Sequence, residues 1–240
     1  MLELQTVDGP MGLYESLPAG DKPAERAVIV IQEAFGVNDH IKSVADRFAA
    51  EGYHAVAPEL FHRAGAGTAP YEDFSKVLPL FAGLDDAGLL TDVDATLAHL
   101  KTAGFDPPQV AIVGFCMGGR VTFLVAAERS LGAAAGFYGG GIVTARFPQF
   151  PPLIDKASAM KTPWLGLFGD QDESIAVDDV TLLDKALSEA GAEHEIVRYP
   201  DAGHGFHCDA RPGHYNEAAA ADGWQRTLDW FARHLPVSSV

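Results

Sequence analysis

The chain has 240 residues, of which 48% are hydrophobic and 21% are charged. That length allows a full hydrophobic core, and the balance is typical of a globular protein rather than a disordered one. Acidic residues outnumber basic ones by 33 to 17, which gives a formal net charge of −16 at pH 7. We therefore expect no nucleic-acid partner, because an acidic surface repels phosphate groups.

The sequence gives no sign of a membrane segment or a secretion signal. No apolar run approaches the roughly 20 residues that a membrane-spanning helix needs, so we expect no membrane association. Residues 1–10 lack the basic start and the long apolar stretch of a secretory signal. We expect a cytoplasmic protein that is a monomer or a small homo-oligomer.

Short β-rich runs alternate with longer amphipathic stretches along the chain. This alternation is typical of βαβ units and predicts an α/β fold with a mostly parallel central sheet and helices on both faces. We expect strands at residues 27–31, 54–57, 110–113, 132–138, 164–168 and 195–199. Helices are expected at residues 39–51, around 93–100, at 117–129, at 177–190 and along the stripe Trp224, Leu228, Phe231 and Leu235. No linker or repeat interrupts the pattern, so residues 1–240 are predicted to form one domain.

Residues 58–90 fit this alternation least well. Pro, Gly and Ala interrupt a possible helix near residues 71–77. Such a stretch is compatible with a loop over a cleft, and the sequence leaves open whether it forms a mobile lid.

The strongest chemical signal surrounds Cys116. Gly114, Cys116 and Gly118 form a G-x-C-x-G pattern directly between a predicted strand and a predicted helix. This is the pattern of a nucleophile elbow with Cys in place of Ser, in which the glycines relieve crowding at a tight turn. The helix that begins at Met117 points its N-terminal N–H groups toward the sulfur, which favours the thiolate. A buried structural cysteine is the alternative, but the flanking glycines favour a nucleophile.

A cysteine nucleophile needs a base and a group that orients the base. In this architecture both follow the nucleophile along the chain, each after a later strand. Asp170 and Asp172 follow the strand at 164–168, and His204 follows the strand at 195–199 between two glycines. His204 is therefore the predicted base, with a solvated loop histidine as the alternative. Spacing alone does not choose between the two aspartates.

Five segments in order resemble the dienelactone hydrolase family, a branch of the α/β-hydrolase fold with a Cys-Asp-His triad. They are residues 32–36 (QEAFG), 57–61 (APELF) with Arg63, 114–119 (GFCMGG), 169–172 (GDQD) and 203–206 (GHGF). The resemblance covers nearly the whole chain. It implies an α/β-hydrolase fold and a hydrolase of the carboxymethylenebutenolidase type, which acts on lactones or carboxylic esters.

The same resemblance implies a role for individual residues. Cys116 would be the nucleophile and His204 the base, and Asp172 would be the orienting acid because the family's acid is the fourth residue of the G-x-x-D run. The oxyanion hole would consist of the backbone N–H groups of Met117 and Ala34.

Glu33 matches a glutamate that members of the family place beside the resting thiol. A carboxylate there opposes formation of a second negative charge, so substrate binding would have to move it aside before the thiolate forms. The alternative is an ordinary surface acid in a loop.

The sequence departs from the well-known dienelactone hydrolases at the substrate end. Those enzymes resemble one another in holding the substrate carboxylate with two arginines, one of them shortly after the catalytic His. Here Cys208 stands four residues after His204, and residues 64–119 contain no arginine. The candidate substitutes are Arg211, Arg63 and Lys76. Tyr138 is a candidate wall of the pocket, with a core tyrosine as the alternative.

Two other classes of protein are alternatives. A Cys/His metal-binding protein would use the cluster His204, His207, Cys208 and His214. Structural metal sites use regularly spaced pairs on more than one segment, and no second pair appears, so we expect no metal. The other alternative is a non-catalytic binder that has kept the fold.

The residues and the resemblance together predict a hydrolase that cleaves a lactone or a carboxylic ester through a cysteine thioester. No cofactor is expected, because the nucleophile, base and acid all come from the chain. The expected partner is a small-molecule lactone or ester, which the family's arginines suggest is anionic.

Overall fold

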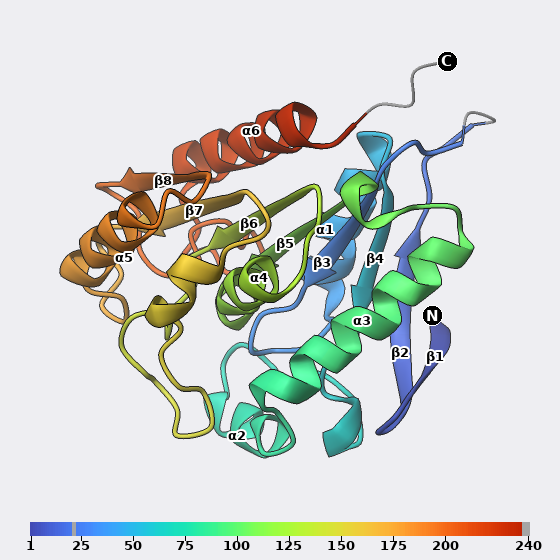
Figure 1. Ribbon diagram of the computed structural model, residues 1–240. Coiled ribbons are helices and arrows are strands. Elements are labelled where there is room, and N and C mark those ends of the chain that lie inside the picture. The colour runs from blue at the N-terminus through green and yellow to red at the C-terminus, as the bar shows by residue number, and fades with distance from the viewer. Residues whose placement is uncertain (21–22, 237–240) are drawn as a thin grey trace.

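An eight-stranded sheet runs through the computed structural model, which describes residues 1–20 and 23–236 (Figure 1). The strands lie in the order β1-β2-β4-β3-β5-β6-β7-β8. From β4 to β8 all neighbouring strands are parallel, whereas β2 pairs antiparallel with both β1 and β4. The bounds are β1 Leu2–Thr6, β2 Gly9–Ser16, β3 Ala27–Ile31, β4 His54–Pro58, β5 Val110–Phe115, β6 Ala133–Phe137, β7 Trp164–Gly169 and β8 His194–Tyr199.

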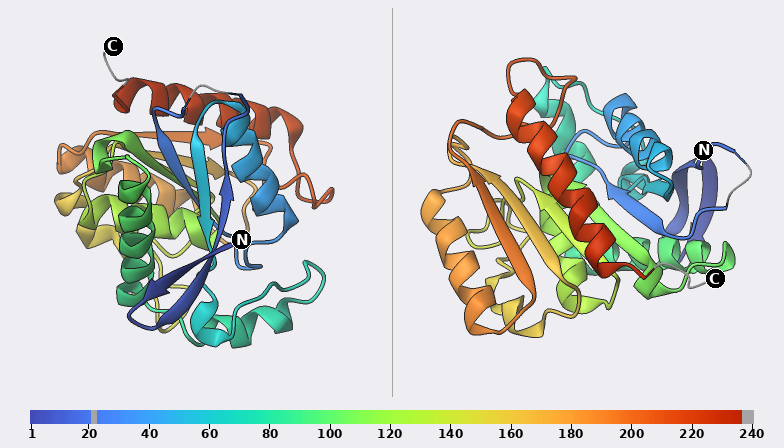
Figure 2. Two further views of the ribbon diagram at one scale, coloured as in Figure 1. Left: turned by 90° about the vertical axis from the view of Figure 1, so that its right-hand side faces the viewer. Right: turned by 90° about the horizontal axis from the view of Figure 1, so that it is seen from above.

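Helices cover both faces of this sheet. Helices α1 and α6 lie on one face, and α3, α4 and α5 lie on the other (Figures 1 and 2). The α-helices are α1 Asp39–Ala50, α2 Val77–Phe81, α3 Asp86–Thr102, α4 Met117–Glu128, α5 Val177–Glu189 and α6 Glu217–His234. Short 3-10 helices occur at η1 His62–Ala64, η2 Phe74–Lys76, η3 Pro107–Gln109 and η4 Ile154–Ala159. None of the helices in the described ranges is both long and apolar enough to cross a membrane.

The core is formed by the central strands and the inner faces of the helices. Every residue of β3, whose sequence is AVIVI, is buried. Strands covered on both faces lose the polar–apolar alternation of a surface sheet and become continuously apolar. Each Val or Ile buried in this way contributes about 1.5–3 kcal/mol to folding. On the α1 and α6 face, Phe48 packs against Trp224 and Phe231.

The prediction of a mostly parallel sheet with helices on both faces is confirmed. The six expected strands are present with ends that differ by at most two residues. The five expected helices are also present, but α3 and α6 each begin seven residues before the predicted stretch. Strands β1 and β2, the antiparallel pair at the edge of the sheet, were not predicted from the sequence. In β2 the alternate residues Met11 and Leu13 are buried, but the intervening Gly12 and the preceding Pro10 weaken the strand pattern.

The helix expected near residues 71–77 is displaced along the chain. Residues 71–73 precede the helical part, which begins with η2 at Phe74 and continues as α2 to Phe81. Asp73 caps this segment by accepting a hydrogen bond from the backbone N–H of Ser75. The start is therefore set by an Asx cap, a common signal at a helix N-terminus.

Helix α4 packs so closely on the sheet that glycine is required. A Cβ at Gly118 would lie 2.6 Å from the carbonyl oxygen of Ile31 and 2.7 Å from that of Gln32. A Cβ at Gly114 would lie 2.2 Å from the carbonyl oxygen of Gly118. These neighbours are backbone atoms of a central strand and a helix, so neither can move aside without disturbing the core.

We predict that Gly118→Ala lowers the free energy of unfolding by about 1–3 kcal/mol or more, because the added methyl group overpacks this contact. Gly213→Ala is the matched control, since a Cβ there has nothing within 4 Å. The control should lie within about 0.5 kcal/mol of the wild type. Urea denaturation measures both values, and equal stabilities for the two variants would contradict the close-packing argument.

Candidate active site

Cys116 occupies the sharp turn between β5 and α4. Its backbone has φ 55° and ψ −114°, a left-handed conformation that non-glycine residues rarely adopt and that costs about 1–3 kcal/mol. The turn is held by hydrogen bonds from the Cys116 N–H to the carbonyl of Phe137 and from the Gly119 N–H to the carbonyl of Cys116. The side chain is partly exposed. The strained backbone thus presents the sulfur at the carboxyl end of the sheet.

His204 and Asp172 reach this sulfur from the loops that follow β8 and β7. His204 Nε2 lies 3.1 Å from Cys116 Sγ, and His204 Nδ1 lies 2.6 Å from Asp172 Oδ2. Ser174 donates its hydroxyl hydrogen to Asp172 Oδ1 at 2.6 Å. In the sequence His204 is 88 residues from Cys116 and 32 residues from Asp172. The structure therefore brings together a thiol, an imidazole and a carboxylate that are far apart in the chain.

The two loops approach one another at Gly169, the last residue of β7. A Cβ at Gly169 would lie 2.2 Å from the carbonyl oxygen of Ala202, so a larger residue would push the loops apart. The Gln171 N–H donates to that same carbonyl at 2.9 Å. The glycine of the GDQD segment therefore has a packing role.

The environment of His204 favours its protonated form. Burial alone lowers the pKa of this imidazole, but the negative charge of Cys116 and the hydrogen bonds to Asp172 and Cys116 outweigh it and raise the pKa from 6.5 to about 10. For Asp172, burial raises the pKa, yet the hydrogen bond and charge of His204 dominate and lower it. The arrangement therefore favours an imidazolium between a carboxylate and a sulfur.

The structure shows which of Asp170 and Asp172 lies beside His204, a choice that their spacing in the sequence left open. Asp170 forms a bidentate ion pair with Arg198 at 2.7 and 2.8 Å, away from His204. Asp172 is buried and contacts the imidazole. The position implied by the family pattern is thus the one beside the histidine.

Glu33 lies inside the protein, so its interpretation as an ordinary surface acid is wrong. Only 1% of the residue is exposed, and Oε1 accepts a hydrogen bond from the Tyr138 hydroxyl at 3.3 Å. Oε2 has no hydrogen-bond partner within the described part of the chain. A buried carboxylate oxygen without a partner costs stability and does not contribute to it.

Tyr138 does not line the candidate pocket and forms part of the core behind it. It is fully buried, its backbone has φ 39°, and its ring contacts the ring of His204 with centroids 5.2 Å apart. Burial and the charge of Glu33 raise the pKa of its hydroxyl well above 10. The tyrosine therefore remains a neutral donor to Glu33.

A cavity of ≈ 160 Å³ opens beside the thiol. Cys116, His204 and Glu33 line it, and so do Met117 and Ala34, whose N–H groups are the expected oxyanion donors. Met117 is the first residue of α4, where the N–H group has no acceptor within the helix. The remaining walls are largely aromatic, formed by Phe35, Phe74, Phe81, Phe147 and Phe150.

Two segments that carried little sequence signal supply much of this wall. Phe74 and Phe81 come from the stretch 58–90, which therefore does cover the cavity. Phe147, Phe150 and Arg146 come from the long connection between β6 and η4, for which no role was predicted from the sequence. The repeated Phe-Pro pattern at residues 147–151 was the available signal.

Arg63 does not lie at the cavity, so its expected role in substrate binding is wrong. Its guanidinium contacts Asp8 and Asp92 at distances from 2.7 to 2.9 Å. Asp92 is fully buried and also contacts His62. These carboxylates neutralise the arginine and anchor the start of the 58–90 stretch. Lys76 is exposed and likewise is not part of the cavity wall.

Arg211 does line the cavity, as expected, and Arg146 joins it. The Arg211 guanidinium lies over the rings of Phe35 and Tyr71, 5.5 and 5.3 Å from their centroids. Across residues 1–20 and 23–236, no carboxylate forms an ion pair with either arginine. Arg120 also reaches the cavity, but Asp86 holds it in a bidentate pair.

The expected alternative metal cluster does not assemble. His207 is buried between Phe115 and Trp224, and burial lowers its pKa well below 6.5. Cys208 is buried and contacts the Tyr71 hydroxyl at 3.4 Å, and burial raises its pKa to about 12. His214 instead contacts Arg211 and the carbonyl of His204. The four side chains thus have separate surroundings.

Comparisons with known proteins agree with this architecture. The family model described as "Dienelactone hydrolase family" matches residues 14–235. A Salmonella typhimurium protein named "Putative carboxymethylenebutenolidase" is 43% identical over 231 residues, which cover 93% of this chain and 83% of that protein. The "Carboxymethylenebutenolidase" of Rhodococcus opacus is 33% identical over 225 residues, which cover 92% and 86%.

A solved structure shows the same fold. It is described as a "Putative Dienelactone Hydrolase" from Klebsiella pneumoniae, has 39% sequence identity and a TM-score of 0.86, and matches over 96% of each chain. The sheet and its helices are accordingly those of an α/β-hydrolase fold. The chain belongs to the dienelactone hydrolase family and is a hydrolase of the lactone and ester class.

Proposed function

We propose that the protein hydrolyses a lactone or carboxylic ester through a thioester on Cys116, with His204 as base and Asp172 as its orienting acid. The observation that carries this proposal is the continuous chain of contacts from Asp172 Oδ2 through the imidazole to Cys116 Sγ, at 2.6 and 3.1 Å. An activated nucleophile needs a base within about 2.6–3.2 Å and a third group that orients the base.

In the first half of the reaction the Cys116 thiolate attacks the substrate carbonyl carbon and forms a carbon–sulfur bond. The carbonyl oxygen becomes an oxyanion, which the N–H groups of Met117 and Ala34 stabilise. One such donor is typically worth about 3 kcal/mol. The tetrahedral intermediate then expels the alkoxide or enolate oxygen, which takes its proton from His204 Nε2.

In the second half water hydrolyses the thioester. Neutral His204 removes a proton from the water while Asp172 holds the ring in the tautomer that carries hydrogen on Nδ1. The hydroxide attacks the acyl carbon, the carbon–sulfur bond breaks, and the acid product leaves. This step restores the protonated imidazole of His204 and the thiolate of Cys116. No cofactor takes part.

Glu33 is proposed to destabilise the Cys116 thiolate, which the protonated His204 stabilises, until substrate binds. It lines the same cavity as Cys116 and carries an unpartnered oxygen. A second negative charge at this buried position is disfavoured, so a resting thiolate and the Glu33 carboxylate oppose one another. A substrate that displaces the carboxylate would relieve this opposition.

An anionic substrate is proposed from the charges that line the cavity. Arg211 and Arg146 line it without carboxylate partners in the described chain, whereas the protein as a whole carries a net charge of −16. A substrate carboxylate would find two guanidinium groups there whose contacts, with His214 and Ser174, leave their charge without a carboxylate partner. Guanidinium groups bind carboxylates through charge-assisted hydrogen bonds. The aromatic wall formed by Phe74, Phe81 and Phe147 suits a flat or cyclic body.

The nucleophile is tested by trapping the acyl-enzyme. During turnover of p-nitrophenyl acetate, acid quenching should preserve an acetyl group on the protein, and peptide mapping should place it on Cys116. Cys116→Ala should lose the adduct and about 10³-fold or more of the rate. Cys208→Ala, which alters a buried thiol outside the contact chain, should keep the adduct. Full turnover by Cys116→Ala would contradict the proposal.

The proposed anionic substrate class is tested by comparing anionic with neutral substrates in variants of the two arginines. Arg211→Gln should raise KM about tenfold or more for a lactone that carries a carboxylate, because a hydrogen bond to a charged group is lost. A neutral ester should show little change, and Arg146→Gln should follow the same trend. Lys76→Gln is the control, since Lys76 lies outside the cavity wall. An equal rise in KM for anionic and neutral substrates would remove both arginines as carboxylate anchors.

A further inference from the structure

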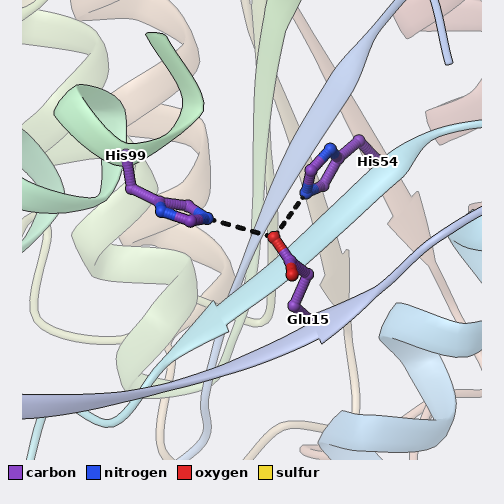
Figure 3. Close-up of side chains that lie close together, drawn as sticks. All are labelled: Glu15, His54 and His99. Atoms are coloured by element: carbon purple, nitrogen blue, oxygen red, sulfur yellow. Dashed lines mark hydrogen bonds and ion pairs between the residues drawn. The ribbon is translucent and has the colours of Figure 1, made fainter. Parts of the chain in front are cut away.

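Glu15, His54 and His99 form a cluster of potential metal ligands outside the candidate active site (Figure 3). Glu15 Oε1 lies 2.8 Å from His54 Nε2 and 3.0 Å from His99 Nε2. In residues 1–20 and 23–236 this is the one group of three or more His, Cys, Asp or Glu side chains whose ligand atoms all lie within 4.8 Å of one another.

The sheet register explains why these residues meet. Strands β2 and β4 pair antiparallel with Glu15 opposite Val56, so the side chain of His54, two residues from Val56, points to the same face as Glu15. The neighbouring Tyr14 points to the opposite face, where its hydroxyl donates to Asp46 of α1. Helix α3 covers the Glu15 face and supplies His99 near its C-terminal end.

We propose that Glu15, His54 and His99 bind a divalent transition-metal ion, with zinc as the ion whose preferences they match. Two imidazole nitrogens and one carboxylate oxygen are a known three-residue ligand set for zinc, with water in the fourth position. Zinc–ligand bonds of about 2.0–2.2 Å in a tetrahedron separate the ligand atoms by about 3.3 Å. The present 2.8 and 3.0 Å distances need to widen by only a few tenths of an ångström.

The side chains are accessible enough for an ion to enter and to keep a water ligand. The exposed fractions are 23% for Glu15, 11% for His54 and 21% for His99. The long side chain of Glu15 and the helix-borne ring of His99 can therefore adjust to a metal ion without repacking the core. The three ligands come from β2, β4 and α3, so the ion would cross-link the edge of the sheet to the helix that covers it.

This site would act on stability and not on hydrolysis. His54 opens β4, level with Val110 at the start of β5, because both pair with Ala27. Cys116 follows the other end of β5, six residues further on and so about 20 Å away along the strand. The metal site is thus at the opposite end of the sheet from the cavity, and its test is independent of the thioester proposal.

Zinc titration of the untagged, chelator-treated protein tests the site. The Cys116→Ala background should be used, because a thiol beside an imidazole can also bind zinc. We expect one equivalent of zinc to bind and the thermal midpoint to rise. Cobalt(II) should bind to the same residues and give the strong visible absorption of a four-coordinate ion.

Substitutions identify the ligands. His99→Gln and Glu15→Gln should each weaken zinc binding by about 10–100-fold or more, since even residues behind the ligands have effects of that size. His194→Gln is the matched control, because His194 also contacts a carboxylate, Asp184 at 3.1 Å, but without a second imidazole. Glu15→Gln keeps the shape of the side chain, so this variant should still fold and a loss of zinc binding would report the loss of a ligand.

Two outcomes would overturn the proposal. The first is the absence of saturable binding of one equivalent in the Cys116→Ala background. The second is unchanged zinc affinity in folded His99→Gln and Glu15→Gln proteins. Either would show that the three residues serve only as a hydrogen-bonded link between the sheet and α3.

Discussion

The contact of one imidazole with both a carboxylate and a sulfur is the interaction on which the proposed chemistry of this protein depends. Asp172 fixes the orientation of His204, and the opposite ring nitrogen reaches Cys116 at 3.1 Å. Because the negative groups on both sides raise the pKa of His204 to about 10, the ring can hold a proton at neutral pH. A thiolate partnered in this way can attack an ester carbonyl, and the same proton can then go to the leaving oxygen.

The sheet holds these groups together although they are far apart in the chain. Parallel strands β5, β7 and β8 all end at the same edge, so the turns and loops that follow them meet there. Glycine permits the close approaches at Gly118 and at Gly169, where a side chain would collide with backbone. The stability of the buried central strands β3 to β7 therefore supports a strained backbone at Cys116.

Local sequence patterns predicted the parts of the structure that are set by residues close together in the chain. The strand–glycine–helix signal placed Cys116 correctly on the elbow, and loop position placed His204 beside it. The partners of charged side chains could not be predicted, because they come from distant segments. Arg63 is held by Asp8 and the buried Asp92, whereas Arg146 reaches the cavity from a connection without periodicity.

Nuclear magnetic resonance titration of the His204 ring tests the central interaction most directly. In protein with labelled histidine, the account predicts that His204 titrates far above the ordinary pKa of 6.5, toward about 10. Cys116→Ala and Asp172→Asn should each lower this pKa, because each removes a negative partner of the imidazolium. A pKa near 6.5 in the wild type, unchanged in both variants, would contradict the account.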